Sequence, residues 1–502
     1  MHFEFHRMRS QKSFTPIKPR LPAGGSLIVA LKKTMQRIVS GGRQASSFTL
    51  IEPLIVTPQR KLLRSFQRGK SASSFTLIEL LIVIGILAVL VAAVVVVLNP
   101  AQLLAQARDS KRQQDLSALN QALNTVYALD QTISFGTSSI VYTSLPDSSS
   151  TCGSWGLPTL PSGWSYHCSP TTTLQQTNGT GWIPVNFNTT GAVSLASLPL
   201  DPQNTSSTGL YYTYVTGGSY ELTAAFESTK YKMGGDGDKA STDGGSYPDL
   251  YEQGSNLSLQ PIDHGDLSLV GYWPLNEGTG TIAYDRSGNN NNGTWNGTPS
   301  GDNGTFYAVS NGKTVGYFDG MDNYVNALSS STMNTITQEM TIVGQINPFS
   351  APLWLNNAGC QNGFVIFGRN KATYTAPYRI IYFQLGGGNG AWYPAALFGH
   401  LDGTSDGGVC TDGYSTSTFP NIWTFFATTF SLSQGADVFY INGSVMRSFT
   451  NSGKTIMTDN TPGLIGGGIS GGTDMDGLIS NVRIYNRALS ASEIQALYNA
   501  TK

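Results

Sequence analysis

The sequence predicts an α+β part, made of a long helix and a small antiparallel sheet, followed by an all-β sandwich. Three observations predict this fold class. Residues 80–98 contain neither a charge nor a proline. Apolar residues then recur at three- and four-residue steps to about residue 129, the spacing of one helix face. From about residue 266, short apolar runs alternate with Gly- and Asn-rich turns, a pattern typical of a sandwich.

Charge is distributed unevenly along the 502 residues. Residues 1–74 hold 14 Lys and Arg against two acids, a net 14 − 2 = +12, whereas the remainder carries 16 − 29 = −13. A basic segment before an apolar run is typical of a leader that stays in the cytoplasm. The acidic remainder lacks the basic face that binds phosphates, so we expect no nucleic acid partner.

The apolar run at 80–98 is long enough to form a membrane span. Its 19 residues would make a helix of about 28 Å, close to the thickness of a bilayer core. The basic flank predicts that the C-terminal body faces outward. An ordinary single-span anchor or a cleaved secretory signal would also explain the run.

The start of the run carries a specific motif. Residues 73–83 read Ser-Ser-Phe-Thr-Leu-Ile-Glu-Leu-Leu-Ile-Val. This stretch resembles the cleavage and methylation motif of type IV prepilins and type II secretion pseudopilins. The resemblance implies that a prepilin peptidase cuts between Ser74 and Phe75 and methylates the new Phe75 amine. It also implies that Glu79 pairs with the N-terminal amine of a neighbouring subunit. The family usually has Gly where Ser74 stands.

The leader contains a second copy of the motif. Residues 45–52 repeat residues 72–79 at an offset of 27, but Pro53 follows where Leu80 stands in the later copy. A helix broken by proline cannot span a bilayer. We interpret residues 1–74 as a basic leader with a degenerate duplicate, and a functional second site is the alternative.

A long helix over 75–129, kinked near Pro100, is expected to form the membrane-embedded or filament-core element. A pilin-like globular domain over 130–255 follows, with strands such as 182–187 and a tight hairpin at Gly217-Gly218. Its Leu-Pro-Leu-Asp-Pro run at 198–202 and Tyr-rich hairpin resemble pseudopilins, whose major subunits bind calcium in the next loop. The resemblance implies a calcium site here, and a solvated Gly/Asp loop is the alternative. The candidate ligands are Asp236, Asp238 and Asp243.

A linker at 256–265 is expected to lead into a domain over 266–500. Six segments of this domain resemble the LamG-like or concanavalin A-like jelly roll, and the resemblance implies a β-sandwich that binds carbohydrate. They are residues 271–278, 285–293, 315–325, 423–427, 438–443 and 476–488. Acidic positions in these segments, Asp285, Asp319 and Asp476, are candidate calcium ligands, although Asp before a turn also caps it.

The domain is predicted to be a binding module and not an enzyme. Glycan hydrolysis needs two carboxylates on one strand face. From residue 264 on, the Glu residues are Glu277, Glu339 and Glu493, and none has an acid two residues away. Aromatic residues that could stack on sugars include Trp354, Trp392 and Tyr393, and the alternative is that they fill the sandwich core.

The four cysteines fall two by two into the expected domains. Cys152 and Cys168 lie in the pilin-like part, and Cys360 and Cys410 lie in the sandwich. An even count in each outward-facing domain fits two intradomain disulfides, Cys152–Cys168 and Cys360–Cys410, with free thiols as the alternative.

Together these patterns predict a minor or tip type IV pilin-like subunit that presents a carbohydrate- or surface-binding domain in adhesion. The expected partners are other pilin subunits, the prepilin peptidase, the inner membrane and a glycan or surface ligand. The precursor would lie in the inner membrane and the mature chain in a filament at the cell surface. The alternatives are a secretion-system pseudopilin with a structural sandwich and a membrane-anchored lectin that never polymerises.

Overall fold

The computed structural model describes residues 76–189, 191, 195–349, 363–370, 379–388, 391–399, 405–407, 421–467 and 474–502. The chain divides into two compact units, Met1–Leu80 and Leu81–Lys502. Thr76–Leu80 is the described part of the first unit, and the second unit contains three sheets. The predicted fold class, an α+β part followed by an all-β sandwich, is confirmed.

Two helices occupy the region where one kinked helix is predicted. Helix α2 spans Leu77–Leu98 and helix α3 spans Pro100–Leu129. Between them Asn99 adopts a left-handed conformation (φ 40°), and its side chain accepts a hydrogen bond from Gln102 N. The break follows from Pro100, which suits the first turn of a helix but cannot continue the preceding one.

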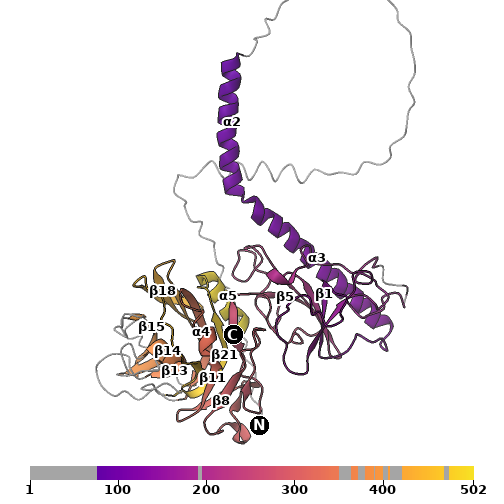
Figure 1. The fold of residues 1–502 in the computed structure, drawn as a ribbon. Coiled ribbons are helices and arrows are strands. Elements are labelled where there is room, and N and C mark those ends of the chain that lie inside the picture. Colours follow the sequence, from indigo (N-terminus) through magenta and orange to yellow (C-terminus); the bar gives the residue numbers. More distant parts are fainter. Residues whose placement is uncertain are drawn as a thin grey trace, which may run out of the picture. The chain divides into compact units, whose positions relative to one another are not determined.

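Helix α3 lies across a five-stranded sheet, sheet A (Figure 1). Its strand order is β2-β1-β3-β4-β5, with β1 and β2 parallel and the other pairs antiparallel. The strands are β1 (Ile140–Pro146), β2 (Ser165–Ser169), β3 (Tyr212–Thr216), β4 (Tyr220–Ala225) and β5 (Leu250–Gly254). We call α3, sheet A and their loops the body.

The body confirms one local prediction and corrects another. The hairpin at Gly217-Gly218 joins β3 to β4, with Gly218 at φ 81°. The strand predicted at 182–187 is absent, and the segment forms only an isolated bridge between Asn178 and Asn186. Pro184 lacks the N–H that a strand ladder requires, so the apolar side chains of this segment enter the core from a loop.

The remaining strands form a sandwich of two eight-stranded sheets. Sheet B has the order β19-β18-β17-β12-β21-β10-β9, with β6 also paired to β21, and sheet C has the order β16-β15-β14-β13-β20-β11-β8-β7. Sheet B contains β6 (Leu269–Trp273), β9 (Tyr307–Ser310), β10 (Lys313–Asp319), β12 (Glu339–Pro348), β17 (Thr424–Ser431), β18 (Ala436–Ile441), β19 (Ser444–Thr450) and β21 (Asp476–Tyr485). Sheet C contains β7 (Ile282–Ala283), β8 (Gly293–Asn296), β11 (Tyr324–Leu328), β13 (Gly363–Asn370), β14 (Arg379–Gly388), β15 (Ala391–Gly399), β16 (Ser405–Gly407) and β20 (Gly463–Ile465).

The central strands of sheet B, β12, β17 and β21, are buried on both faces. Along β12, Ile342 and Ile346 enter the core between sheets B and C, whereas Val343 points to the outer face. Such alternation follows from the two-residue repeat of a strand. Helix α5 (Ala491–Thr501) packs on the outer face and begins with the predicted capping box of Ser490 and Glu493. The short helix α4 spans Ser330–Met333.

The body completes the cover over the outer face of sheet B. One buried cluster joins Leu210 and Leu250 of the body to Val343, Phe425 and Tyr485 of the sandwich. We call this cluster the shared core. The segment 256–265, predicted as a linker, contributes buried residues beside it, namely Gln260, Ile262, Asp263 and His264. These residues are therefore part of the packed structure between body and sandwich.

Candidate functional site

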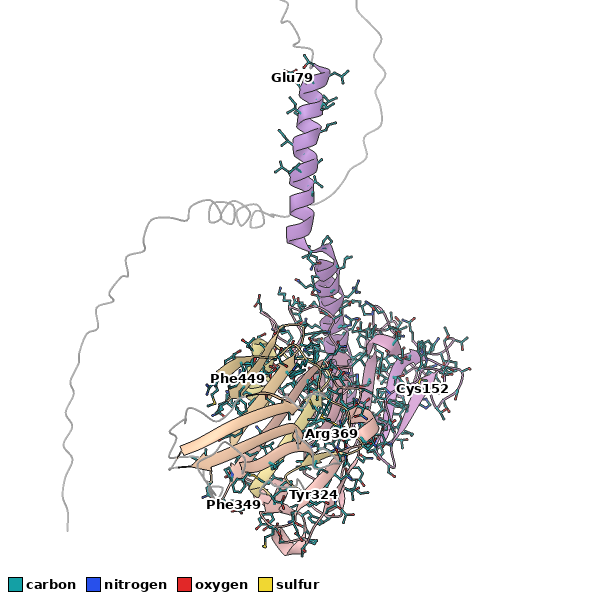
Figure 2. All side chains as sticks on the ribbon, turned by 60° about the vertical axis from the view of Figure 1, so that its left-hand side comes forward. Glu79, Cys152, Tyr324, Phe349, Arg369 and Phe449 are labelled. Atoms are coloured by element: carbon teal, nitrogen blue, oxygen red, sulfur yellow. A yellow bond between two sulfur atoms is a disulfide. The ribbon has the colours of Figure 1, made fainter. Side chains whose placement is uncertain are left out.

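The start of α2 carries the predicted assembly residue. Ser74 and Phe75 lie outside the described residues. Glu79 is exposed, and its carboxylate accepts hydrogen bonds from Thr76 N (2.8 Å) and Thr76 Oγ1 (2.9 Å), while Glu79 N donates to Thr76 Oγ1. This reciprocal arrangement is a capping box, and Figure 2 labels Glu79 at the start of α2. The carboxylate is fixed at the helix start and open to a further cationic partner.

The rest of α2 presents apolar side chains on all sides. Twelve large side chains between Leu77 and Val91 are 44–83% exposed. Glu79 is the acid of its first turn. A helix that is hydrophobic all round is normally covered by protein or lipid. Among the residues that the structure describes, no helix is both long and apolar enough to cross a bilayer.

A groove of about 1060 Å³ lies between the body and the outer face of sheet B. The body contributes Trp164 and two loop segments, 245–247 and 258–261. The sandwich contributes the ends of several strands and the last turn of α5. Its lining residues include Tyr272, Asn276, Arg286, Ser310, Asn311, Lys313, Gln345, Trp423, Asn442, Asn481 and Lys502. The groove therefore exists because body and sandwich pack together.

One side of the groove is an ordered chain of polar groups. Tyr272 donates its hydroxyl hydrogen to Asn481 Oδ1 (3.0 Å), and Asn481 Nδ2 donates to Gln345 Oε1 (2.7 Å). Gln345 Nε2 in turn donates to the carbonyl of Thr501 in α5 (2.7 Å). Because each of these side chains is hydrogen-bonded to the next, they are oriented before any ligand binds.

Aromatic and cationic side chains complete the lining. Trp164 and Trp423 are half-buried, and the indole N–H of Trp423 donates to Ser310 Oγ (3.0 Å). Among the described residues that line the groove, the charged side chains are Arg286, Lys313 and Lys502, and none is Asp or Glu. This arrangement suits a ligand with flat apolar faces, hydroxyl groups and negative charge.

Behind the groove, a buried ionic group joins the body to β21. Arg483 is fully buried, stacks over the ring of Tyr272 at 3.8 Å and lies 3.5 Å from Asp263 Oδ2. Burial raises the pKa of Asp263 to about 6 although Arg483 opposes this shift, and burial lowers the pKa of His264 to about 4. Burial and then the neighbouring Asp263 also raise the pKa of Asp249. We interpret this group as structural, because its charged atoms are enclosed.

The calcium candidates of the body do not converge. Asp236 is exposed. Asp238 accepts hydrogen bonds from Gly234 N, Ser241 N and Ser241 Oγ, and Asp243 accepts from the backbone N–H groups of Gly245 and Glu252. In the part of the chain that the structure describes, no group of three His, Cys, Asp or Glu residues could hold a metal ion. Backbone and serine donors satisfy Asp238 and Asp243. Calcium binding here stays a prediction.

The sandwich candidates separate into a pair and a single residue. Asp319 and Asp476 are opposite each other in the β10–β21 register, and Asp319 accepts hydrogen bonds from Met321 N and Ser300 Oγ. Asp285 is buried elsewhere and accepts hydrogen bonds from the backbone of Tyr272, Ser287 and Asn291. Asp285 therefore organises a turn, as an Asp in such a loop can. A calcium ion at these acids also stays a prediction.

The three Glu residues of the sandwich sit in separate structural roles. Glu277 accepts from Tyr284 N, and Glu339 accepts from the hydroxyl of Ser431. Glu493 is the N3 residue of the α5 capping box and pairs with Arg487. Each therefore stabilises a different element.

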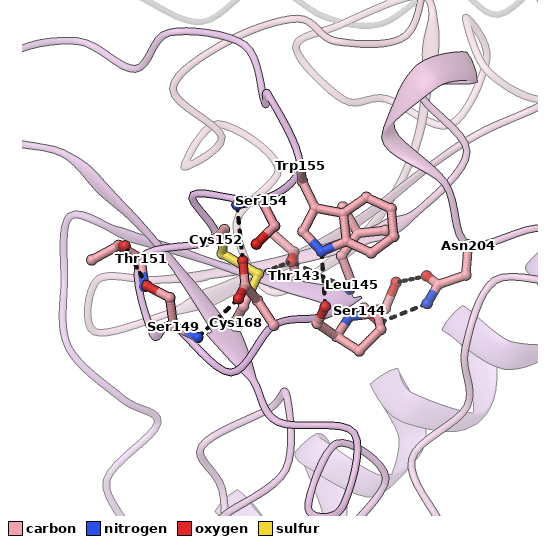
Figure 3. Close-up of a disulfide and its surroundings, with 12 residues drawn as sticks. Thr143, Ser144, Leu145, Ser149, Thr151, Cys152, Ser154, Trp155, Cys168 and Asn204 are labelled. Carbon is pink, nitrogen blue, oxygen red and sulfur yellow. Dashed lines mark hydrogen bonds between the residues drawn. A yellow bond between two sulfur atoms is a disulfide. The ribbon is translucent and has the colours of Figure 1, made fainter.

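One of the two predicted disulfides is confirmed. Cys152 and Cys168 are bonded, with their Cα atoms 5.3 Å apart, and link the loop after β1 to β2 (Figure 3). Trp155 covers this region, and its indole N–H donates to Pro146 O (2.8 Å). Cys360 and Cys410 lie outside the described residues, so the second disulfide stays a prediction.

The sequence analysis does not name Trp164 or Trp423 as sugar-stacking residues, although Trp423 lies in the resembling segment 423–427. The aromatics singled out there, Trp354, Trp392 and Tyr393, fall outside the residues whose side chains the structure describes. Trp164 follows Gly163 in a turn, and Trp423 directly precedes β17. A large aromatic residue in a turn or at a strand boundary is less easily packed into the core. This position in the sequence was the signal that could have indicated Trp164 and Trp423 as surface residues of a site.

Comparisons with known proteins match the two ends of the chain separately. A family model of the prokaryotic N-terminal methylation motif matches residues 69–95, and a model of the concanavalin A-like lectin/glucanases superfamily matches residues 318–495. None of the curated proteins matches this chain.

Solved structures resemble slightly less than half of the chain. Domain 4 of an extracellular arabinanase from Geobacillus stearothermophilus, in complex with arabinotriose, is 19% identical, with 46% of this chain and 98% of that chain covered and a TM-score of 0.33. The binding domain of Paraclostridial Mosquitocidal Protein 1 is 17% identical, with 46% and 52% covered and a TM-score of 0.34. A Trypanosoma rangeli sialidase is 16% identical, with 46% and 33% covered and a TM-score of 0.31. The chain thus combines a prokaryotic N-terminal methylation motif with a domain of the concanavalin A-like lectin/glucanase superfamily.

Proposed function

We infer that this protein is a pilin-like filament subunit that presents a carbohydrate- or surface-binding domain at the cell surface. The carrying observation is the exposed apolar helix α2 with Glu79 fixed at its start, inside the matched methylation motif. An apolar helix of this kind needs a cover, and neighbouring copies of the same helix in a filament supply one. The precursor is first anchored in the inner membrane, where a prepilin peptidase cuts before Phe75.

The proposed role of the sandwich is binding and not hydrolysis. Its Glu side chains are engaged in turns, strand ends and a helix cap, whereas its polar and aromatic groups converge on the groove. A binding domain of this size would hinder packing at every position of a filament, which favours a minor or tip subunit in adhesion.

The filament role is tested by Glu79→Gln. We expect the variant to be inserted and cleaved but to be lost from sheared filaments, because the neutral amide cannot form the ion pair with an incoming amine. The matched control is Glu52→Gln in the degenerate copy, which should assemble normally. Mass spectrometry of the mature chain should find a methylated Phe75. Normal assembly of Glu79→Gln would contradict the mechanism, and an intact leader would leave a membrane-anchored lectin.

A further inference from the structure

The groove between the body and sheet B has the size of a ligand site. Its volume of about 1060 Å³ lies just above the range for small-molecule sites, which is roughly 300–1,000 Å³. Both parts of the chain line it, so its shape is fixed by the shared core beneath it. A preformed groove of this kind loses little conformational entropy when it binds.

The polar groups of the groove are suited to hydroxyl-bearing ligands. Asn276, Asn311 and Asn442 are exposed in the lining, and the amides of Gln345 and Asn481 are already oriented. Each side-chain amide both donates and accepts hydrogen bonds, which matches the dual character of a sugar hydroxyl. The half-buried faces of Trp164 and Trp423 offer apolar surfaces against which the C–H faces of sugar rings pack.

The charge of the groove opposes the charge of the protein. Residues 75–502 carry 16 − 29 = −13, yet the charged side chains in the described lining are all cationic. The Arg286 guanidinium donates one hydrogen bond, to Pro261 O (3.3 Å), and other donors of its planar fork remain for a ligand. Lys313 is exposed at the start of β10. Carboxylate or sulfate groups are the partners that such cations prefer.

We propose that this groove binds an acidic oligosaccharide, with its sugar rings against Trp164 and Trp423 and its anionic groups at Arg286 and Lys313. The proposal rests on the surface-binding function inferred above and names the class of its ligand. It places the site at the junction of body and sandwich, so that the sandwich alone would lack part of it.

The test uses the full chain purified in detergent and titrated by calorimetry with three probes: oligogalacturonate, sulfated dextran and neutral dextran. We expect binding of at least one acidic probe, weaker binding at higher salt, and no binding of neutral dextran. Trp423→Ala should weaken binding about ten-fold. Lys313→Gln should weaken it about two- to five-fold and reduce the salt dependence.

The matched controls are Trp155→Ala and Lys232→Gln, which alter a half-buried Trp and an exposed Lys outside the groove. Both should bind like the native chain. Because Trp423→Ala could disturb the hydrogen bond to Ser310, Trp164→Ala serves as a second variant from the opposite wall, and thermal melting verifies that each variant is folded.

Three outcomes would overturn the proposal: equal binding of neutral and acidic probes, no binding of any probe, or acidic binding that the groove variants leave unchanged. The first leaves surface binding intact and rejects only the ligand class. The filament role is measured separately by Glu79→Gln, so its failure is distinguishable from failure of the groove.

Discussion

At the residue scale, three acids share a buried position in the body. Glu221 accepts hydrogen bonds from Leu259 N (2.6 Å) and Gln260 N (2.8 Å), and Asp243 accepts one from Glu252 N. Burial raises the pKa of Glu252 to about 11, helped by its contact with Glu221, and burial raises the pKa of Asp243 to about 7. These carboxyls therefore hold protons at pH values where free acids have lost them.

Asp243→Asn should change how stability depends on pH. In the folded chain Asp243 keeps its proton to about pH 7, whereas in the unfolded chain it loses it near pH 3.9. The native residue thus contributes stability that is fully present below about pH 4 and is lost as the pH rises to 7. The free energy of unfolding, measured in denaturant at pH 4, 5.5 and 7, should fall less steeply in the variant.

The control for this prediction is Asp236→Asn, an exposed residue of the same loop. Its stability profile should run parallel to that of the native chain. A parallel profile for Asp243→Asn as well would mean that Asp243 titrates normally in the folded protein.

At the element scale, α3 is attached to the body by both an apolar stripe and an ionic cluster. Leu116, Leu119 and Leu123 are fully buried on one face of α3, as the three- and four-residue spacing predicts. One turn earlier, the fully buried Arg112 pairs with Asp201 (2.5 Å), Asp109 (2.7 Å) and Glu227 (2.7 Å). The periodicity predicts the stripe, but Asp201 and Glu227 lie far along the chain, so no local pattern indicates the cluster.

Arg112→Met should destabilise the body by about 3–5 kcal/mol, because it leaves two fully buried carboxylates without their cation. Urea denaturation measures the loss. Lys111→Met is the matched control, since the Lys111 side chain is 57% exposed and Asp115 keeps its hydrogen bond from the Tyr212 hydroxyl. We expect that control to stay within about 1 kcal/mol of the native chain. If Arg112→Met were as stable as Lys111→Met, the attraction between Arg112 and its carboxylates would only balance the free energy that burying their charges costs.

At the scale of the whole second unit, body and sandwich are joined by the shared core. Phe425 and Tyr485 of sheet B and Leu250 of the body bury the same apolar surface. Separating the two parts would return this surface to water, which is unfavourable roughly in proportion to its area. The two parts are therefore expected to unfold together.

Calorimetry of the full chain should show one transition for sheets A and B. Leu250→Ala should lower its midpoint, because the cavity costs about 2–5 kcal/mol in the core that both parts share. Hydrogen exchange should then rise in peptides from β5 and from β12 alike. The control is Val309→Ala, whose side chain is 65% exposed on β9. Two separate transitions, or increased exchange in the body alone, would show that body and sandwich are independent.

The sequence by itself determined the features that depend on residues close together in the chain. The apolar run with Glu79 at its start, the Gly217-Gly218 hairpin and the Ser490 capping box depend on contacts a few residues apart. The strand expected at 182–187 was wrong because its apolar residues fill a core from a loop, where burial leaves no periodic signal.

Only the tertiary structure decided where the two halves meet. The sequence marks 256–265 as a linker because polar and turn residues gather there, but the structure buries Ile262 and Asp263 in that segment. It also places Trp164 and Trp423, distant in the chain, on one groove. The physical reason is that the packing of one face against another depends on complementary surfaces brought together by the whole chain, and no spacing along the sequence encodes that match.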